Sequence, residues 1–463
     1  MFLDGARHAG DGELTVTSPW RGEVVGTVPS DTADQVNDAV RHVRAAWRPL
    51  PPAERAAVLR RAATLLGERA DEFSTLIASE SGVCVRETRR EVERAGSNLT
   101  VAAAEAERLR GESIPVPGHH RLAVTVPEPV GVVAALTPFN RPLNQVVVKV
   151  APAVAAGCAV VLKPSEKTPL TALVFAELLV AAGFPAGALA VTTGSPGTIG
   201  PALVGHPDVD MVTFTGGIAA GRAVAAAAAG KRLLLELGGN DPLIVLPDAD
   251  VDLAVTLAAD GAFATAGQSC RGVKRIIAVG DVAEALVPRL VETARGRRAG
   301  DPQDPATDLG PLITVDAAAL VERRIADAVA AGAKLLHGGE RTGALLTPAV
   351  LDHVPPDAEL VMEETFGPVA PVIRVDRVDE ALQVANGTRY GLQAGVVTGD
   401  LAAFWRLAAG LRVGAVNLGA GPQFDSPHIP FGGVKASGIG REGIRYAIRE
   451  MSVIKTITIP YLG

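Results

Sequence analysis

Three polar side chains lie where covalent chemistry could occur. Cys270 lies in the segment 267–272, which reads GQSCRG, between a predicted helix and a predicted strand. A thiol in such a polar segment can be exposed, and the neighbouring cation of Arg271 favours the nucleophilic thiolate. Most free cysteines are instead buried as small apolar residues. The apolar surroundings of Cys158 predict that use, and we expect Cys84 to be inert as well.

A carboxylate and an amide could complete such a reaction. Glu236 follows an apolar strand and precedes two glycines in the segment 235–240, LELGGN. Apolar surroundings raise the pKa of a glutamate, which would make Glu236 a general base, although a capping or ion-paired glutamate is the simpler interpretation. Asn140 ends the segment 137–140, TPFN, where its amide could donate to a developing oxyanion. Each of these signals is weak alone.

The elements that would position these residues alternate along the region 130–236. Strands are predicted at 130–137, 159–163, 188–192, 211–214 and 232–237, and helices over 142–156, 169–182, 198–205 and 219–229. Apolar strands joined by helices indicate a parallel sheet covered on both faces. Because ligands of such sheets bind beyond the carboxyl ends of the strands, we expect the site after Thr137, Lys163 and Phe214.

The flanking regions are expected to support this sheet. Upstream helices are predicted over 34–47, 53–81 and 85–110, with Asp31 or Thr32 as the first cap. Apolar stretches within 113–130 indicate a protruding ribbon, and residues 453–459 could form an edge strand. Beyond residue 238, helices are predicted over 251–266, 282–297 and 315–331, and strands at 275–279, 370–375, 395–398 and 415–417.

Composition and charge exclude several classes of protein. The chain has 463 residues, 48% hydrophobic and 21% charged, which is typical of a globular protein larger than one small module. A net charge of -7 without long like-charge blocks gives no reason to expect nucleic acid or a membrane surface as partner. Every long apolar run is interrupted and residues 1–5 show no secretory signal, so we expect a cytoplasmic protein. The three dispersed cysteines predict no disulfide framework and no metal site.

Eight segments, in order, resemble motifs of the aldehyde dehydrogenase superfamily along nearly the whole chain. They are 131–143 (GVVAALTPFNRPL), 149–153 (KVAPA), 161–169 (VLKPSEKTP), 214–217 (FTGG), 235–239 (LELGG), 267–270 (GQSC), 363–368 (EETFGP) and 430–438 (PFGGVKASG). The separation of Glu236 from Cys270 is also similar to that of the family. The resemblance implies an α/β aldehyde dehydrogenase fold with a Rossmann-like dinucleotide-binding domain, an α/β catalytic domain and a small oligomerisation element.

The resemblance also implies where these parts lie. Residues 1–112 and 129–236 would form the dinucleotide-binding domain, and residues 237–430 the catalytic domain. The segments 113–128 and 431–463 would form the oligomerisation ribbon and the C-terminal segment. Because an exposed ribbon and an unpaired edge strand invite association, a homodimer or a homotetramer is expected.

The same resemblance implies a covalent mechanism for the oxidation of an aldehyde to an acid. The Cys270 thiolate would attack the carbonyl carbon, while the Asn140 amide and the backbone N–H of Cys270 would hold the oxyanion. Hydride would then pass to the nicotinamide and leave a thioester. Glu236 would activate the second substrate, water, and Lys149 would support the proton path.

A nicotinamide cofactor and its contacts follow from the resemblance as well. The expected contacts, of which the last two would hold the nicotinamide ribose and ring, are Thr137, Pro138, Phe139, Lys163, Ser165, Glu166, Gly194, Phe214, Thr215, Gly216, Gly217, Gly221, Leu237, Gly238, Glu364 and Phe366. Glu166 could accept from a ribose 2′-hydroxyl and would repel a 2′-phosphate, so NAD is expected rather than NADP, although Lys163 favours the phosphate. Gly216 and Gly221 begin a helix whose N-terminus would face the pyrophosphate.

Three residues near the expected site are candidates for binding the substrate. Arg141 and Arg271 follow Asn140 and Cys270 and could bind an anionic tail, and His428 could line the same mouth. Ion pairs for the arginines and a turn for the histidine are equally simple interpretations. The motifs are most similar to the lactaldehyde, nonphosphorylating glyceraldehyde-3-phosphate and phosphonoacetaldehyde dehydrogenase branch. However, Ser269 and Thr100 replace arginines of the glyceraldehyde-phosphate type. We expect a short polar or anionic aldehyde, such as a phosphonate aldehyde or a lactaldehyde-like compound.

Three other functions stay open on the sequence. A CoA-acylating semialdehyde dehydrogenase generally lacks a base at the position of Glu236. A non-enzymatic dinucleotide-binding protein would not need Cys270 and Asn140. An alcohol or hydroxy-acid dehydrogenase without a covalent step would keep its activity after alkylation of Cys270.

Overall fold

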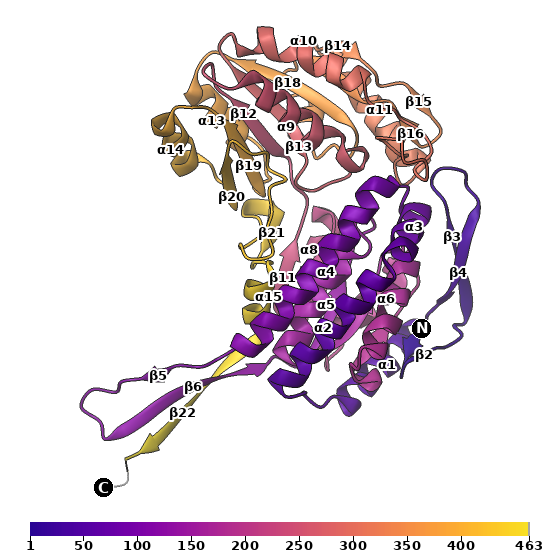
Figure 1. Ribbon diagram of the computed structural model, residues 1–463, viewed down its shortest axis with the longest axis vertical. Coiled ribbons are helices and arrows are strands. Elements are labelled where there is room, and N and C mark those ends of the chain that lie inside the picture. The colour runs from indigo at the N-terminus through magenta and orange to yellow at the C-terminus, as the bar shows by residue number, and fades with distance from the viewer. Residues whose placement is uncertain (462–463) are drawn as a thin grey trace.

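The computed structural model describes residues 1–461, which form two large sheets with helices on both faces (Figure 1). The first sheet has the strand order β2-β1-β9-β8-β7-β10-β11-β21. Its strands are β1 Phe2–Leu3, β2 Ala6–Arg7, β7 Val132–Leu136, β8 Ala159–Lys163, β9 Leu189–Val191, β10 Met211–Thr215, β11 Arg232–Glu236 and β21 Gly438–Ile439. Because β7 to β11 run parallel, their carboxyl ends meet at one edge, as predicted.

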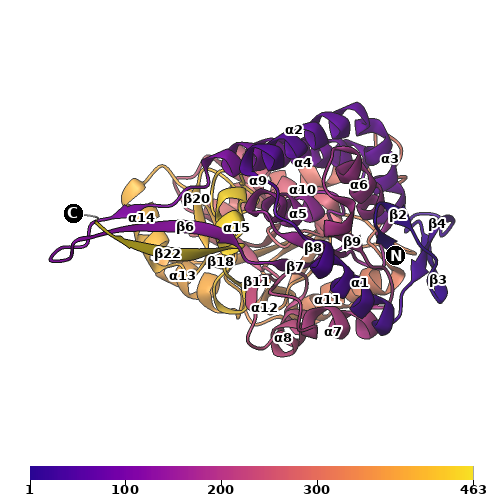
Figure 2. The ribbon, with the colours of Figure 1, turned by 90° about the horizontal axis from the view of Figure 1, so that it is seen from below.

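Helices cover both faces of this sheet. They are α1 Ala33–Ala46, α2 Pro52–Glu68, α3 Ala70–Ser81, α4 Val85–Arg108, α5 Asn144–Ala156, α6 Leu170–Ala181, α7 Pro196–Gly205 and α8 Ile218–Ala227. Figure 2 shows α2, α4, α5 and α6 on one side of the strands and α1, α7 and α8 on the other. All residues of β7, β8 and β10 are buried, which explains their continuous apolar sequences. Thr32 caps α1 in a capping box with Gln35.

The predicted single helix over 53–81 is wrong, because the chain forms two helices there. α2 ends and α3 begins at Arg69, whose φ of -108° and ψ of 21° leave the helical region. Gly67 lies in the last turn of α2, and glycine is a weak helix former. The break therefore occurs where the helical preference of the sequence is lowest.

The second sheet has the strand order β14-β17-β18-β13-β12-β19-β20. Its strands are β12 Asp241–Val245, β13 Val273–Val279, β14 Lys334–His337, β17 Ala349–Asp352, β18 Val369–Val375, β19 Gln393–Val397 and β20 Ala415–Leu418. The larger helices beside them are α9 Val251–Phe263, α10 Val282–Arg295, α11 Val315–Ala330, α13 Val378–Asn386 and α14 Leu401–Gly410. Leu243 and Val245 belong to the core with α9 and α10, whereas Ile244 belongs to the core with α11 and α13. Strands β12, β14 and β17 were not predicted.

A ribbon projects from the first sheet and pairs with the C-terminal strand (Figure 1). It consists of β5 Ser113–Ile114, β6 Arg121–Pro129 and β22 Ser452–Pro460, and β22 runs antiparallel to β6 along its whole length. The predicted strand 453–459 therefore has a partner within its own chain. The last two residues of the predicted segment 431–463 lie outside the described residues.

The remaining elements are short. They are β3 Gly12–Thr17, β4 Val24–Ser30, β15 Arg341–Thr342, β16 Leu345–Leu346, α12 Glu359–Met362, α15 Ile444–Glu450 and the 3-10 turns Ala186–Ala188, Ala264–Gly267 and Lys435–Ser437. The β3–β4 hairpin was not predicted. We propose that the two sheets mark the two large domains, with β21 returning from the C-terminal segment to complete the first. No helix within residues 1–461 is both long and apolar enough to span a membrane.

Candidate active site

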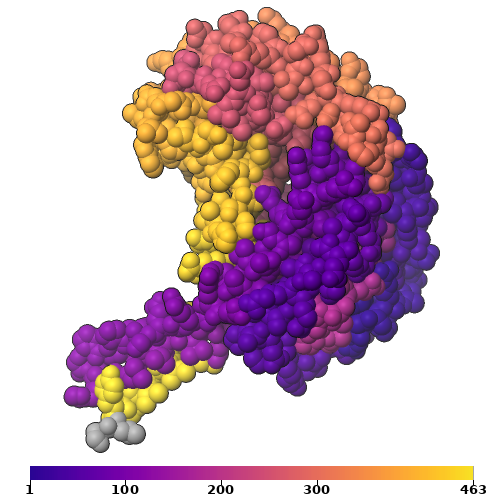
Figure 3. All heavy atoms as spheres, viewed as in Figure 1, coloured from indigo at the N-terminus to yellow at the C-terminus, as the bar shows by residue number. Residues whose placement is uncertain are grey.

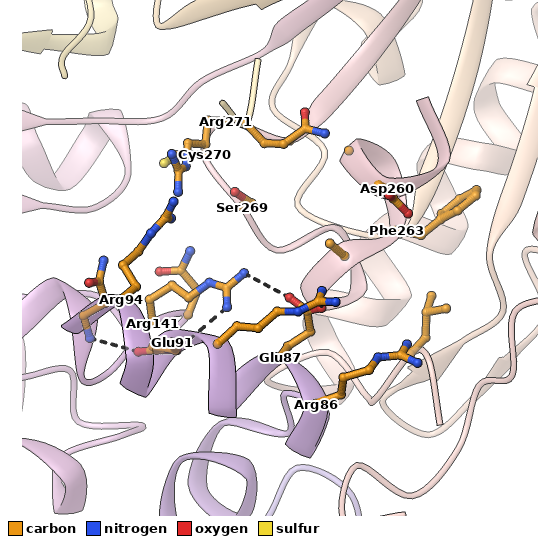
Figure 4. Close-up of a pocket in the computed structure, with 18 of the residues that line it drawn as sticks. Arg86, Glu87, Glu91, Arg94, Arg141, Asp260, Phe263, Ser269, Cys270 and Arg271 are labelled. Carbon is orange, nitrogen blue, oxygen red and sulfur yellow. Dashed lines mark hydrogen bonds and ion pairs between the residues drawn. The ribbon is translucent and has the colours of Figure 1, made fainter. Parts of the chain in front are cut away.

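Two cavities lie near the carboxyl edge of the first sheet. The first, of about 670 Å³, lies between α4 and the segment around Cys270, and Asn140, Arg141 and Arg271 also line it. Figure 3 shows the surface hollowed between the two halves of the molecule, and Figure 4 shows the lining side chains. The second cavity, of about 490 Å³, lies between the ends of β7, β8 and β10 and the helices α7 and α8.

The backbone before Cys270 is strained. The predicted helix 251–266 is wrong over its last residues, because α9 ends at Phe263 and Thr265 and Ala266 adopt left-handed φ values of 57° and 52°. Such a conformation costs about 1–3 kcal/mol for a non-glycine residue and persists only where contacts hold it. Arg141 supplies one contact, since its guanidinium donates to Thr265 Oγ1 at 2.6 Å.

Two further contacts fix the same segment. Gln268 Oε1 accepts from the backbone N–H of Ile313 at 2.9 Å. A Cβ at Gly239 would clash with the carbonyl oxygen of Cys270, so only glycine lets the chain after β11 approach this closely. The glycine that follows Glu236 by three positions thus brings the end of β11 to the thiol segment.

The Cys270 thiol is neutral in this environment. Burial raises the pKa of Cys270 to about 12, and the negative charges of Glu364, Asp241 and Glu236 act in the same direction. The cation of Arg271 opposes this shift but does not overcome it. Thiolate formation therefore requires a base or a change of surroundings when ligands bind.

This raised pKa predicts the pH dependence of Cys270 alkylation. Only the thiolate reacts, so the rate with iodoacetamide should rise about tenfold per pH unit from about pH 7 to pH 10 without a plateau. Mass spectrometry of the peptide that contains Cys270 separates it from Cys84 and Cys158. Arg271→Gln should slow the reaction further because it removes the stabilising cation. A plateau below about pH 8 would mean that the thiolate is already formed at rest.

Glu236 lies buried beside an ion pair. Its exposed fraction is 2%, and neither of its carboxylate oxygens has a hydrogen-bond partner among the described residues. Burial raises the pKa of Glu236 well above its ordinary value, and the negative charge of Glu442 adds to the shift, whereas Lys149 lowers it. A protonatable carboxylate with free oxygens is what a water-activating base requires.

Lys149 and Glu442 form this buried ion pair. Lys149 comes from α5, and reciprocal backbone hydrogen bonds with Phe431 hold Glu442 in place. Sequence reasoning missed Glu442, which lies four residues beyond the motif 430–438. The available signal was Lys149, a lysine within an apolar helix that has no acidic residue nearby in the sequence to pair with. The two charges of this pair act on Glu236 in opposite directions, since Glu442 raises its pKa and Lys149 lowers it.

The Asn140 amide is oriented toward the thiol segment. Its Nδ2 donates to the carbonyl oxygen of Gln268 at 2.8 Å. An amide nitrogen carries two N–H groups, so the second can donate to an oxyanion. The structure therefore brings Asn140, Glu236 and Cys270 to one region, with Lys149 behind Glu236.

The second cavity contains ten of the sixteen expected cofactor contacts. They are Thr137, Pro138, Phe139, Lys163, Ser165, Glu166, Phe214, Thr215, Gly216 and Gly217. Gly194, Gly221, Leu237, Gly238, Glu364 and Phe366 lie outside its described lining. Sequence reasoning missed the lining residues of α7 and α8, which are Pro196, Gly197, Gly200, Pro201, Val204, Ala220, Ala223, Val224 and Ala227. Most of these residues are small, and small residues on two facing helices could have indicated a cavity between them.

The polar groups of this cavity fit a dinucleotide. The buried hydroxyl of Thr215 has no hydrogen-bond partner within the described chain. Burial lowers the pKa of Lys163, Glu166 opposes this, and the lysine amine donates to the Pro164 carbonyl oxygen at 3.2 Å. Gly217 caps α8 without a side-chain bond, so backbone N–H groups at this N-terminus are free to donate to an anion. These donors suit a ribose and a pyrophosphate.

Glu364 and Phe366 lie beside the thiol segment rather than in the second cavity. Glu364 Oε1 accepts from the backbone N–H of Gly239 at 3.2 Å, and burial raises the pKa of Glu364 to about 7. Phe366 packs edge-on against Phe139 at 6.0 Å, and the Lys274 amine lies 5.3 Å from its ring centre. Phe139 thus connects the second cavity with the Cys270 region.

The two expected substrate arginines both line the first cavity and both have acidic neighbours. Arg141 lies 3.8 Å from Glu87 and 3.9 Å from a Glu91 oxygen, and Arg271 Nη1 lies 2.9 Å from Asp425. His428 is exposed and is absent from the described lining of this cavity. Carboxylates therefore partly neutralise both arginines.

Comparison with known proteins identifies the class. The model of the aldehyde dehydrogenase family matches residues 7–457, and the chain belongs to this family. The protein is an NAD(P)-dependent aldehyde oxidoreductase.

Individual relatives differ in substrate and cofactor. The chain is 40% identical over 464 residues to a 3-sulfolactaldehyde dehydrogenase of Priestia megaterium, covering 99% of this chain and 97% of the relative. A solved glyceraldehyde-3-phosphate dehydrogenase GapN of Methanocaldococcus jannaschii, complexed with NADP, superposes with a TM-score of 0.94 at 37% identity, covering 97% and 100%. Betaine aldehyde dehydrogenase of Staphylococcus aureus, in complex with NAD⁺, gives 0.96 at 32% identity, covering 99% and 94%.

Proposed function

We propose that the protein oxidises a short polar or anionic aldehyde to the carboxylic acid through a covalent intermediate on Cys270. The observation that carries this proposal is the buried Glu236 carboxylate, whose oxygens have no hydrogen-bond partner among the described residues. Hydrolysis of a thioester needs such a base, whereas transfer of the acyl group to CoA does not. The unpartnered carboxylate therefore favours water over CoA as the acceptor.

In the first half-reaction the Cys270 thiol gives its proton to water, and the resulting thiolate Sγ attacks the aldehyde carbon. A C–S bond forms, and the carbonyl electron pair moves to oxygen. The free N–H of the Asn140 amide and the backbone N–H of Cys270 stabilise that oxyanion. A nicotinamide dinucleotide, when bound, would supply the hydride acceptor for this carbon. Glu364 and Phe366 are the residues that would hold the nicotinamide end beside the thiol.

In the second half-reaction Glu236 takes a proton from water while the water oxygen attacks the thioester carbon. The C–S bond breaks, the carboxylic acid leaves, and Cys270 returns as the thiolate. The proton on Glu236 can pass toward the Lys149–Glu442 pair, which is buried next to it. A positive charge at Lys149 also limits how far the pKa of Glu236 rises, so the base stays usable.

For the cofactor we propose a preference for NAD. The Glu166 carboxylate lines the second cavity beside Lys163, where it can accept from a ribose hydroxyl and repel a 2′-phosphate. Glu166→Gln should lower the NAD:NADP ratio of kcat/KM by about tenfold. Steady-state kinetics with both cofactors measure the ratio, and Lys167→Gln is the control, since Lys167 is exposed next to it. An unchanged ratio in Glu166→Gln would exclude Glu166 as the discriminating group.

Initial rates of NADH formation with a panel of aldehydes test the proposed function. The panel holds neutral, hydroxylated, carboxylated, sulfonated and phosphonylated aldehydes, each with and without CoA. We expect oxidation without CoA and the highest kcat/KM for a short anionic member. A strict requirement for CoA, or no activity with any aldehyde, would overturn the proposal.

We also propose that the protein forms a homodimer or homotetramer. Large apolar side chains are exposed on the ribbon and at the edge of the second sheet, namely Ile114, Val126, Ile454, Ile457, Ile459 and Leu418. A strand pair with an exposed apolar face and a free edge is stabilised by a second copy of the chain. Sedimentation velocity measures the assembly directly.

A further inference from the structure

The first cavity carries an excess of positive charge. Its described lining contains six arginines, which are Arg86, Arg90, Arg94, Arg141, Arg271 and Arg297. Four carboxylates line it as well, Glu87, Glu91, Asp260 and Asp308, and Asp425 reaches it through ion pairs with Arg94 and Arg271. Six cations thus face five anions, so one arginine charge has no carboxylate to balance it.

Four of the arginines each have a carboxylate of their own. Arg86 pairs with Asp308 at 2.6 Å, and Arg297 pairs with Asp260 at 2.5 Å. Arg90 pairs with Glu87 at 2.8 Å. Arg141 remains near Glu91, whose oxygen lies 3.9 Å away, and it also donates to Thr265. The charge of these arginines is therefore balanced within the protein.

Arg94 and Arg271 must share one carboxylate. Arg94 Nη1 lies 3.3 Å and Arg271 Nη1 lies 2.9 Å from the same Oδ2 atom of Asp425. Figure 4 shows Arg94 reaching from α4 toward Arg271, beside the sulfur of Cys270. Burial lowers the pKa of Arg94, and the like charge of Arg271 lowers it further. The unmatched positive charge therefore lies between these two side chains, next to the nucleophile.

The same part of the cavity also has unused hydrogen-bonding atoms. Arg271 Nη1 makes no hydrogen bond of good geometry within residues 1–461, despite its ion pair with Asp425. The buried side-chain oxygens of Gln145 and Gln423, which line the cavity, also have no partner in the described chain. Buried polar atoms without partners are costly, so a polar ligand with an anionic group and a hydroxyl would satisfy them.

We propose that Arg94 and Arg271 together bind the anionic group of the substrate and select a monoanion, a sulfonate or a carboxylate, over a dianion such as a phosphonate. This inference rests on the proposed aldehyde oxidation and assigns its substrate class. One unmatched charge neutralises one negative charge, whereas a dianion would leave one uncompensated charge in a partly buried site. In this arrangement Arg141 stabilises the strained turn at Thr265 and does not bind the substrate. Because Arg271 directly follows Cys270, the aldehyde carbon and the anion must be close, which requires a short chain.

Competing aldehydes test this inference. At about pH 8 sulfoacetaldehyde and succinate semialdehyde are monoanions, phosphonoacetaldehyde is mainly a dianion and propionaldehyde is neutral. In Arg94→Gln the ratio of kcat/KM for sulfoacetaldehyde to that for propionaldehyde should fall about 10- to 100-fold, and Arg94→Lys should recover part of it. Arg90→Gln is the matched control, since Arg90 lies one turn earlier on α4 and is paired, and its ratio should stay within about twofold of the parent.

The charge of Asp425 gives a test of opposite sign. Asp425→Asn leaves two unmatched cations, so the ratio of kcat/KM for phosphonoacetaldehyde to sulfoacetaldehyde should rise about tenfold. Comparing succinate semialdehyde with sulfoacetaldehyde distinguishes a carboxylate from a sulfonate. A parent enzyme that prefers the phosphonate, or an equal loss in Arg90→Gln and Arg94→Gln, would overturn the inference.

A binding measurement keeps this result separate from catalysis. In Cys270→Ala with cofactor bound, calorimetry should show that the monoanion sulfoacetaldehyde, which this variant cannot oxidise, binds about tenfold or more weakly when Arg94→Gln is added. Equal affinity with and without Arg94 overturns the anion site even if the enzyme is active. If the enzyme oxidises propionaldehyde but shows equal kcat/KM for all the anionic aldehydes, the anion site is contradicted and the proposed function stands. If it oxidises no aldehyde, the proposed function itself is contradicted.

Discussion

Replacing Cys270 by alanine should lower the rate of NADH formation by about 10⁴-fold or more while leaving cofactor binding within about twofold. The reason is structural as well as chemical. Cys270 lies in the first cavity, whereas ten expected cofactor contacts line the second. Loss of the sulfur therefore removes the nucleophile without changing the dinucleotide cavity. Quenching of protein fluorescence by the cofactor measures binding, and absorbance at 340 nm measures turnover.

Cys84→Ala is the control for this experiment. Cys84 is buried at the start of α4, and burial raises the pKa of its thiol to about 12. Its replacement should leave NADH formation unchanged. Appreciable turnover in Cys270→Ala would support a dehydrogenase without a covalent step, and a loss of cofactor binding would point to misfolding.

Glu236→Gln should separate the two half-reactions. Glutamine keeps the size of the side chain but cannot accept a proton, so a burst of about one NADH per active site should be followed by a steady rate that is about 10²- to 10⁴-fold lower. The acyl group then stays on Cys270. Stopped-flow absorbance records the burst, and mass spectrometry of the intact protein detects the thioester.

The Glu236→Gln result has a matched control and two contrary outcomes. Glu128→Gln changes a glutamate on the ribbon, where it pairs with Lys455, and should leave both phases intact. Full steady turnover in Glu236→Gln would exclude it as the required base. Loss of the burst as well would mean that Glu236 acts earlier, as the group that deprotonates Cys270.

The parallel sheet could be predicted because its strands are buried on both faces. β7, β8 and β10 coincide with largely apolar runs in the sequence, and each run is followed by a helical segment. β12 was missed since it is a five-residue strand that begins with Asp241 and a proline. Its burial depends on β13 and β19, which lie far along the chain, and local sequence does not encode that contact.

The same distinction applies to the site. Cys270, Glu236 and Asn140 stand out because each has an unusual local sequence. Glu442 and Arg94 do not, since what makes them important is a partner elsewhere: Glu442 pairs with Lys149 across 293 positions. Arg94 is one charged residue among many on α4 until the fold brings Asp425 and Arg271 to it. The ordered family motifs predict Cys270, Glu236 and Asn140 as candidate residues, whereas Glu442 and Arg94 become candidates only through their contacts in the fold.

The return of the chain to the first sheet has a consequence for biosynthesis. β21 pairs with β11, and β22 pairs with β6, only after the whole second sheet has been made. On the ribosome the first sheet must therefore wait with an open edge and an unpaired ribbon while about two hundred further residues emerge. The Lys149–Glu442 ion pair forms in the same step, so its formation is among the last events of folding. A nascent chain released before β21 would thus carry Cys270 and Glu236 but lack the ion pair beside Glu236.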